Sequence, residues 1–250
     1  MDESKQYGQQ NLSLPHDVVK LPSGGVFYKS KKKAIKVGYL TASDENLLMA
    51  GDTNRDGIVM TLLRSKIYEP DIRPEELLNG DIQAILIFLR NTAFGSEYSF
   101  KLTDPETGKD FDIDVSLEEL YIKKTEVTAN EEGSFTTVLP KSGVTVKLRP
   151  LSFGEQDELD KLGEKYPAGR VAPKQTWKLN KMIVEFNGST DRQLISQNVD
   201  SLPIADAKYI RRFIDDNEPG LDLTKQVIAP SGKEVNVNIA FGVEFFRPFF

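Results

Sequence analysis

The sequence contains no cysteine and only one histidine, so two of the side chains that most often hold transition metals are almost missing. The absence of cysteine excludes disulfide bonds and thiolate metal sites. No apolar run approaches the roughly 20 residues that a membrane-spanning helix requires, so we expect no membrane span. An excess of basic residues is also lacking. The net charge is −6, which argues against a nucleic-acid-binding protein.

Carboxylates are plentiful, but the sequence shows no catalytic constellation. His16 is the single histidine and lies in a polar N-terminal segment, so we do not expect imidazole catalysis. The GxGxxG, Walker A, GxSxG and HExxH motifs do not occur. Residues 110–115 alternate between aspartate and apolar side chains, which is typical of a half-buried strand with a charged solvent face. We therefore predict no catalytic residue, no metal and no cofactor, and we expect that the protein is not an enzyme.

Residues 52–57 resemble the beginning of a calcium-binding loop. Such a loop requires a bidentate glutamate at its twelfth position, and that position here is Leu63. We interpret the aspartates of this segment as helix-capping residues in a turn.

The residues that are present indicate a duplicated chain. With an offset of about 125 residues, similar residues recur in the same order through a helical pattern, a glycine stop and a Pro-Gly turn. The matched pairs are Asp81 with Asp206, Phe88 with Phe213, Leu89 with Ile214, Gly95 with Gly220 and Pro105 with Pro230, followed by 108–110 with 232–234. We predict an α+β fold built from two internally duplicated helix-plus-β-ribbon units.

The hydrophobic pattern predicts the same kinds of element in each half. In the first half we expect a hairpin within 21–41, a helix that Ser43 caps, helices near 56–67 and 75–91, and a ribbon at 97–115. In the second half we expect a strand at 144–148, a helix that begins with acidic residues near 155, a helix with Trp177, Ile183 and Val184, a helix at 203–216 and a ribbon at 221–241.

These elements divide the chain into four parts. We expect an extended N-terminal arm at 1–20, a first half at 21–123, a linker at 124–138 and a second half at 139–250.

Two segments are candidate contacts with partners. The lysine run Lys31, Lys32 and Lys33 is either a solvated hairpin turn or a contact with an anionic surface. Exposed aromatic residues near the C-terminus would form an apolar patch too large for a soluble monomer. They either close the core of the second half or dock into another subunit. The candidates there are Phe245, Phe246, Arg247, Phe249 and Phe250.

Four short motifs carry a resemblance to a known family. They are the LPSGG segment at 21–25, Tyr39-Leu40-Thr41 before an acidic helix start, Leu89-Arg90-Asn91, and the FFRP sequence at 245–248. In this order the chain resembles the baseplate hub and hub-assembly proteins of T-even-like contractile-tailed bacteriophages. The resemblance covers nearly the whole chain.

The resemblance also implies zinc-ribbon knuckles of the form Cys-Pro-x-Cys-Gly at the two ribbon turns. The first turn here is Asp104-Pro105-Glu106-Thr107-Gly108, and the second is Ala229-Pro230-Ser231-Gly232, one residue shorter. Proline and glycine remain but the thiols are gone. Because structural zinc needs four thiolate or imidazole ligands, we expect degenerate ribbons without metal.

The resemblance implies a structural or assembly component of the tail baseplate hub that acts through protein–protein contacts. Its partners would be other phage tail and baseplate proteins in a hetero-oligomeric assembly, without nucleic acid. It would be located in the baseplate of the virion, and in the host cytoplasm during assembly. The alternatives are a transient tail-assembly chaperone that is absent from the mature virion, and a small nucleic-acid- or sugar-binding module.

Overall fold

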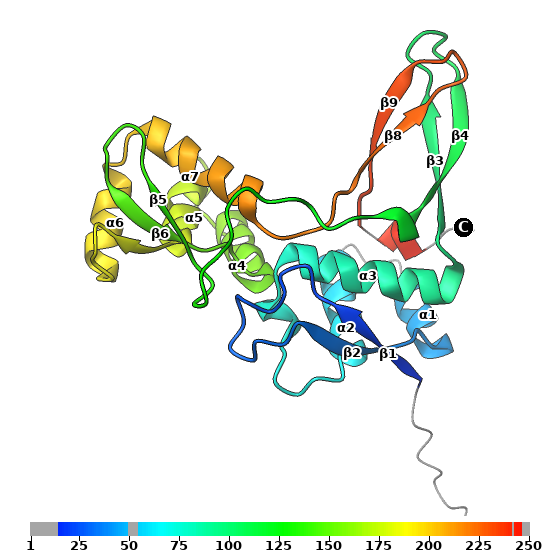
Figure 1. Cartoon of the computed structure of the whole chain (residues 1–250), viewed down its shortest axis with the longest axis horizontal. Coiled ribbons are helices and arrows are strands. Elements are labelled where there is room, and N and C mark those ends of the chain that lie inside the picture. The colour runs from blue at the N-terminus through cyan, green and yellow to red at the C-terminus, as the bar shows by residue number, and fades with distance from the viewer. Residues whose placement is uncertain (1–14, 50–54, 242, 247–250) are drawn as a thin grey trace, which may run out of the picture.

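The computed structural model describes residues 15–49, 55–241 and 243–246. These residues form three parts: a first lobe (15–94), a second lobe (130–217) and a pair of β-ribbons that we call the tower (97–119 and 221–241). Figure 1 shows the tower standing above the first lobe and the second lobe beside them. Helices and small antiparallel sheets occur together, which confirms the predicted α+β class.

The first lobe is a hairpin packed under three helices. Strands β1 and β2 pair with each other, and α3 lies across the hairpin with the other two helices beside it. The elements are β1 (His16–Lys20), β2 (Ala34–Gly38), α1 (Ala42–Met49), α2 (Arg55–Lys66), the 3₁₀ turn η1 (Pro74–Glu76) and α3 (Asn79–Phe94).

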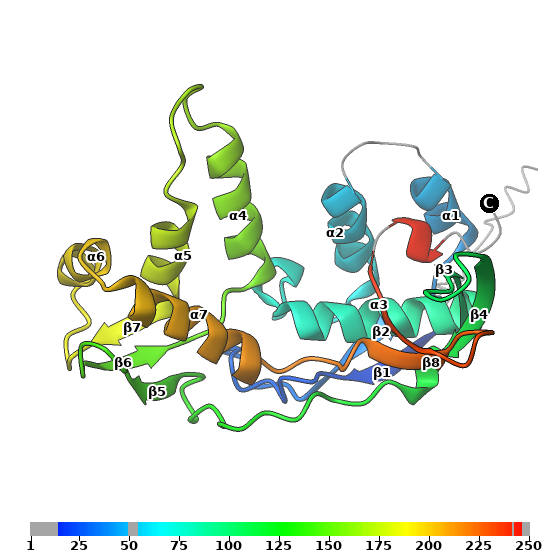
Figure 2. The ribbon, with the colours of Figure 1, turned by 90° about the horizontal axis from the view of Figure 1, so that it is seen from above.

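The second lobe is a three-stranded sheet, in the order β5-β6-β7, covered by helices. Figure 2 shows that α4 and α5 form a helical hairpin that projects away from the sheet. The elements are β5 (Phe135–Val138), β6 (Thr145–Leu148), α4 (Phe153–Glu164), α5 (Lys174–Met182), β7 (Ile183–Phe186), α6 (Arg192–Asp200) and α7 (Ile204–Asn217).

The tower combines ribbons from two distant parts of the sequence. Strand β3 (Glu97–Thr103) pairs with β4 (Asp110–Ser116), and β8 (Thr224–Ile228) pairs with β9 (Glu234–Asn238). Both ribbons occur where the alternating pattern predicts them. Short 3₁₀ turns follow them, η2 (Leu117–Glu119) and η3 (Val243–Phe246).

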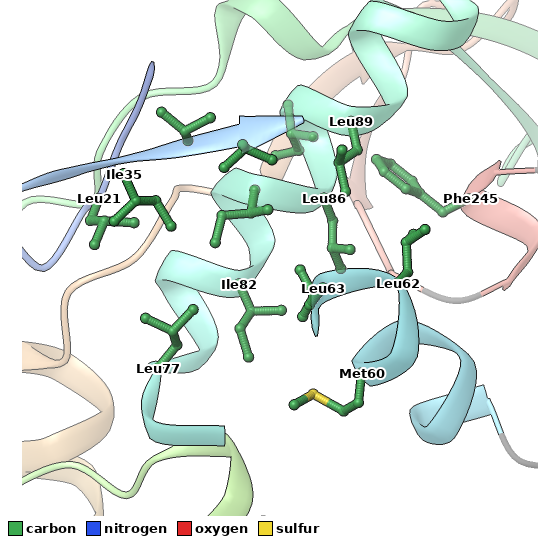
Figure 3. Packing of buried hydrophobic residues seen from close by; sticks show 14 of the residues in the cluster. Leu21, Ile35, Met60, Leu62, Leu63, Leu77, Ile82, Leu86, Leu89 and Phe245 are labelled. Atoms are coloured by element: carbon green, nitrogen blue, oxygen red, sulfur yellow. The ribbon is translucent and has the colours of Figure 1, made fainter. Parts of the chain in front are cut away.

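Helix α3 organises the core of the first lobe. Its residues Ile82, Ile85, Leu86 and Leu89 are buried, as expected for a helix that is apolar on most sides. Figure 3 shows Ile82, Leu86 and Leu89 packed among residues of α2, the β1–β2 hairpin and the ring of Phe245. A second core lies between the sheet and the helices of the second lobe.

A buried aspartate fastens the glycine turn of the first lobe. Asp81 is the third residue of α3 and is 0% exposed. Its carboxylate accepts hydrogen bonds from the Ser23 N–H at 2.9 Å and the Ser23 hydroxyl at 2.5 Å, and the Tyr28 hydroxyl also donates to it. Burial raises the pKa of Asp81 despite these hydrogen bonds. The helix and the turn at 21–25 are thereby held together.

A second aspartate does the same in the second lobe. Asp206 is the third residue of α7 and is also 0% exposed. Its two oxygens accept hydrogen bonds from the N–H groups of Lys141 and Ser142, at 2.8 and 2.9 Å. Burial would raise the pKa of Asp206, but the two N–H donors outweigh it and hold the pKa below its usual value.

The order of elements also recurs. In each half a hairpin is followed by two helices, then by the helix that carries the buried aspartate, and then by a ribbon. The second half contains β7 and α6 in addition. That this order reflects an internal duplication remains our proposal.

Two boundaries and one element type differ from the sequence-based expectation. Residues 16–20, expected within the arm, form β1 and pair with β2. Residues 21–33 are therefore a connecting loop, closed by a hydrogen bond from Leu21 N–H to Lys33 O, and not the first strand of a hairpin. β5 begins at Phe135, inside the segment expected as a linker.

The third difference concerns Ile183 and Val184. We expected them in a helix, but they form β7 on the edge of β6. Two consecutive β-branched residues favour a strand once a neighbouring strand offers hydrogen bonds, and the local pattern cannot reveal that neighbour.

Candidate interaction surfaces

The aromatic residues near the C-terminus fill the core of the first lobe. Phe245 and Phe246 are 0% and 3% exposed. The ring of Phe245 lies 5.3 Å from that of Tyr98 and 4.8 Å from that of Phe241, measured between centroids. Burying each phenylalanine contributes roughly 1.5–3 kcal/mol. These two rings therefore stabilise the chain itself.

This location corrects one expectation. We expected the rings to close the core of the second half or to enter another subunit, but they pack on the helices of the first half. Arg247, Phe249 and Phe250 lie outside the described residues. The prediction that the tail contacts a partner therefore rests on those three residues.

Arg90 holds the C-terminal segment in place. Its guanidinium donates hydrogen bonds to three backbone carbonyls: Phe245 O at 3.1 Å, Gly95 O at 2.5 Å and Glu97 O at 2.8 Å. It also lies 4.9 Å from the centre of the Tyr98 ring. Arg90 is 1% exposed, and burial lowers its pKa from the usual value. A planar group with several fixed donors suits this position better than lysine would.

Two of the three residues in the lysine run have partners within the chain. The Lys31 ammonium donates to Val26 O and to Glu131 O, both at 2.7 Å, so it joins the two lobes. Lys32 forms ion pairs with Glu69 and with Asp71. The hydrogen bonds that the Lys32 ammonium donates to these two carboxylates, Asp71 first, raise the pKa of Lys32.

Lys33 is exposed. Contact of the run with an anionic surface stays a prediction.

The two ribbons of the tower meet through their apolar faces. Val115 on the first ribbon and Val227 and Val237 on the second are buried against each other, with Phe100, Leu102, Ile113 and Val235 around them. At the turns, the Asp104 carboxylate accepts hydrogen bonds from the N–H groups of Glu106 at 2.9 Å and Thr107 at 3.2 Å. It also accepts one from Ser231 N–H of the other ribbon at 2.9 Å. One carboxylate thus connects both turns.

The residues at the two ribbon turns do not match the ligand set of a zinc knuckle. The turns lie together, as the two halves of such a site would, but the ligand positions hold Asp104, Thr107 and Ala229. The second turn is one residue short, so Gly232 takes the place of the last two positions. Only Asp104 among these residues offers a charged side chain, and its oxygens already accept three backbone hydrogen bonds.

Within the described ranges, no group of three or more histidine, cysteine, aspartate or glutamate side chains is arranged to hold a metal ion. His16 lies on β1, and its ring meets that of Tyr68 edge-on at 5.9 Å. The calcium-like segment begins in residues 50–54, which are outside the described part of the chain. No described helix is long and apolar enough to cross a membrane.

Several large apolar side chains remain on the surface of the described structure. Val171 at the tip of the α4–α5 hairpin is 93% exposed, and Ile204 at the start of α7 is 74% exposed. Tyr121 and Ile228 are 73% and 69% exposed, near the foot and the tip of the tower. Single exposed apolar residues are common, but they give specific positions at which a contact surface can be tested.

Sequence reasoning missed the roles of Arg90 and Asp104. Arg90 was part of a motif, and Asp104 part of a turn, but neither pattern shows that the partner atoms lie in a distant segment. The sequence did contain a signal for a different pair of contacts. Asp81 matches Asp206, and each of them accepts a hydrogen bond from the backbone of a turn.

Comparison with protein families shows to which family this chain belongs. A family model described as T4 bacteriophage base plate protein matches residues 18–247, which includes both lobes and the tower. The chain belongs to this baseplate family. It is a structural protein of a phage tail, as the resemblance of its short motifs implied. Comparisons of this baseplate protein with curated proteins and with solved structures find no match.

Proposed function

We propose that this baseplate protein is a component of the central hub and acts through protein–protein contacts without catalysing a reaction. The match to the baseplate family over residues 18–247 carries the proposal. The described polar clusters support it, because Asp81, Arg90 and Asp104 all connect segments of the chain to each other. Obligate interfaces in such assemblies bury roughly 2,000–5,000 Å².

The partners that we propose are other tail and baseplate proteins, in a hetero-oligomeric assembly without nucleic acid. The site in the mature virion would be the baseplate, and assembly would take place in the host cytoplasm. The test is to mix the purified protein with the full set of purified baseplate proteins of the same phage, and to follow co-migration by size-exclusion chromatography. A protein that stays alone in the full mixture contradicts the proposal.

Surface variants sharpen this test. Val171→Ser and Ile204→Ser remove exposed apolar groups without touching either core. Thr136→Ser on β5 is a matched control, because it is exposed and loses only one methyl group. If a proposed contact includes the tip of α4–α5 or the start of α7, the corresponding variant should weaken co-migration at unchanged thermal stability.

The second candidate is a tail-assembly chaperone that leaves before the virion is complete. Mass spectrometry of purified virions separates the two functions, because a hub component is present in a fixed copy number and a chaperone is missing. Binding to nucleic acid is the third possibility. It would show as affinity that falls steeply as the salt concentration rises.

A further inference from the structure

A cavity and an open cleft adjoin the place where the two lobes meet. The cavity, of about 340 Å³, lies between the start of α3 and the helices α4, α5 and α7. The cleft, of about 510 Å³, lies between α3 and the two chain segments that connect the lobes. Asn79, Asp215 and Glu218 line both spaces. Packing between the lobes therefore leaves open space beside these three residues.

The backbone is closely packed beside these spaces. Gly80, in the first turn of α3, lies against Pro219 and Gly220, and a Cβ atom at position 80 would overlap the Gly220 Cα and the Pro219 carbonyl oxygen. The connecting segments pair briefly here, because Lys123 N–H donates to Gly220 O and Asp222 N–H donates to Tyr121 O. We call this region, residues 79–80, 121–123 and 218–222, the joint.

Glu218 ends α7 at the centre of the joint. Its Oε1 atom is buried and accepts no hydrogen bond from any described residue. A buried acceptor without a donor has lost its hydration and gained no hydrogen bond in return. The free-energy cost is much larger when the carboxyl group is ionised. The observed packing therefore suits a neutral carboxyl group better than a carboxylate.

The charged groups around Glu218 come from every element of the joint. Asp215 lies one turn earlier on α7, and Asp81 of α3 also adds negative potential. Lys123 opposes them, but its ammonium already donates to the Asp215 carbonyl. Arg211 and Lys178 line the cavity, and Asp222 lines the cleft. Burial, and then Asp215, raise the pKa of Glu218 to about 7.

We propose that Glu218 is a proton-dependent latch: its protonation holds the second lobe against α3, and its ionisation loosens the joint. An ionised carboxylate needs water or a cation at Oε1, and the adjoining cavity and cleft are the route by which water can enter. The ends of the lobes would then move about the connecting segments 121–123 and 218–222. This inference is independent of the proposed hub function, because it concerns the isolated chain.

The test measures the distance between the lobes as a function of pH. Since the natural sequence has no cysteine, the pair Val18→Cys and Ile204→Cys accepts two spin labels without background. Both positions are exposed, at 61% and 74%, and they lie on different lobes. Pulsed electron paramagnetic resonance should give a narrow distance distribution at pH 5.5 and a broad or longer one at pH 8.5, with a midpoint near pH 7.

Three variants in the labelled background decide whether Glu218 is responsible. Glu218→Gln should keep the narrow distribution over the whole pH range. Asp215→Asn removes a neighbouring negative charge, so it should shift the midpoint to lower pH. The control Glu158→Gln, which changes an exposed glutamate on α4, should leave the midpoint unchanged.

A wild-type distribution that is the same at both pH values overturns the proposal, as does a Glu218→Gln variant that still responds to pH. If Glu218→Gln does not fold, the Asp215→Asn shift and a carbon-13 titration of the wild-type glutamate carboxyls remain. A Glu218 carboxyl that titrates near pH 4.5, or a midpoint that Asp215→Asn leaves in place, then contradicts the latch.

Discussion

The first and second halves each contain a buried aspartate at a matched position, but the two aspartates have different hydrogen-bond donors. Asp81 and Asp206 each stand third in a helix, and each binds the backbone of a glycine turn that follows a Leu-Pro sequence. Asp81 also meets two hydroxyl groups and has a raised pKa, whereas Asp206 meets two N–H groups and has a lowered pKa. The same helix position can therefore hold a carboxyl group with a raised pKa or one with a lowered pKa, depending on its burial and its donors.

The helix starts of the two halves also have similar hydrogen bonds. Asp44 in α1 accepts hydrogen bonds from Thr41, and Glu155 in α4 accepts one from the backbone of its N-cap residue, Ser152. Each carboxylate also has a cationic partner, Lys66 for Asp44 and an arginine for Glu155. In the first half the ion pair is nearly inaccessible, and in the second it is partly exposed. The ion pair at the helix start is thus more deeply buried in the first half than in the second.

The largest expected difference between the halves is in the unfolding free energy that is lost when each aspartate is replaced by alanine. Asp81→Ala leaves the Ser23 N–H and two hydroxyl groups buried without an acceptor, so we expect it to cost roughly 3–5 kcal/mol of unfolding free energy. Asp206→Ala leaves two N–H groups near the surface and should cost about 1–3 kcal/mol. Urea unfolding of both variants measures the difference. An equal or larger loss for Asp206→Ala breaks the comparison.

The next effect concerns a matched position at which the two halves differ in residue type and burial. Arg90 in α3 is buried under the C-terminal segment, and the residue that matches it in α7 is the exposed Asp215. Arg90→Lys cannot reach three carbonyls with one ammonium, so we expect a loss of about 2–3 kcal/mol. Arg212→Lys, at an 84% exposed side chain, is the control and should leave the midpoint of chemical unfolding unchanged.

The two glycines of the joint should respond unequally to the same substitution. Gly80→Ala places a methyl group on the backbone of 219–220, so we expect a cost of about 1–2 kcal/mol. Gly220→Ala meets only the Gly80 Cα at 3.6 Å, an ordinary contact, and should cost less than about 1 kcal/mol. Thermal unfolding monitored by circular dichroism distinguishes them. Equal shifts would mean that the joint adjusts to both.

The smallest effect is a difference in pH dependence. Because the folded-state pKa of Asp206 is lowered, its contribution to stability is present above the unfolded value of 3.8 and is lost as the pH falls through the folded pKa. The folded-state pKa of Asp81 is raised, so its contribution is present below 3.8 and is lost as the pH rises through the folded pKa.

Unfolding free energies measured from pH 2.5 to 7 check these signs. Asp206→Asn should flatten the acid side of the stability profile, and Asp81→Asn should flatten the fall above pH 4. A profile in which both variants flatten the same side contradicts the assignment.

The sequence predicted what depends on local pattern. The α+β class, the ribbons at 97–115 and 221–241, and the buried face of α3 follow from periodicity and turn residues. The pairing of β1 with β2 was missed because β1 is short and carries one buried residue, Val19. Strand β7 was missed because its partner, β6, lies far away in sequence.

The candidate contacts were harder to predict for the same reason. Nothing in the aromatic pattern of 241–250 tells which core the rings enter, because the answer depends on the space that α2 and α3 leave open. Lys31 and Lys32 looked like a solvated cationic run, yet each has partners that arrive from elsewhere in the chain. Residue types gave the chemistry of these groups, and only the tertiary structure gave their partners.

The link from Arg90 to Phe245 has a consequence for synthesis. The two residues are 155 positions apart, and the whole second lobe is made between them. As the ribosome works from the N-terminus, helix α3 must wait with an incomplete core until the phenylalanines emerge. A nascent chain interrupted within the second lobe would lack Phe245 and Phe246, so it would expose that apolar surface to proteases and chaperones.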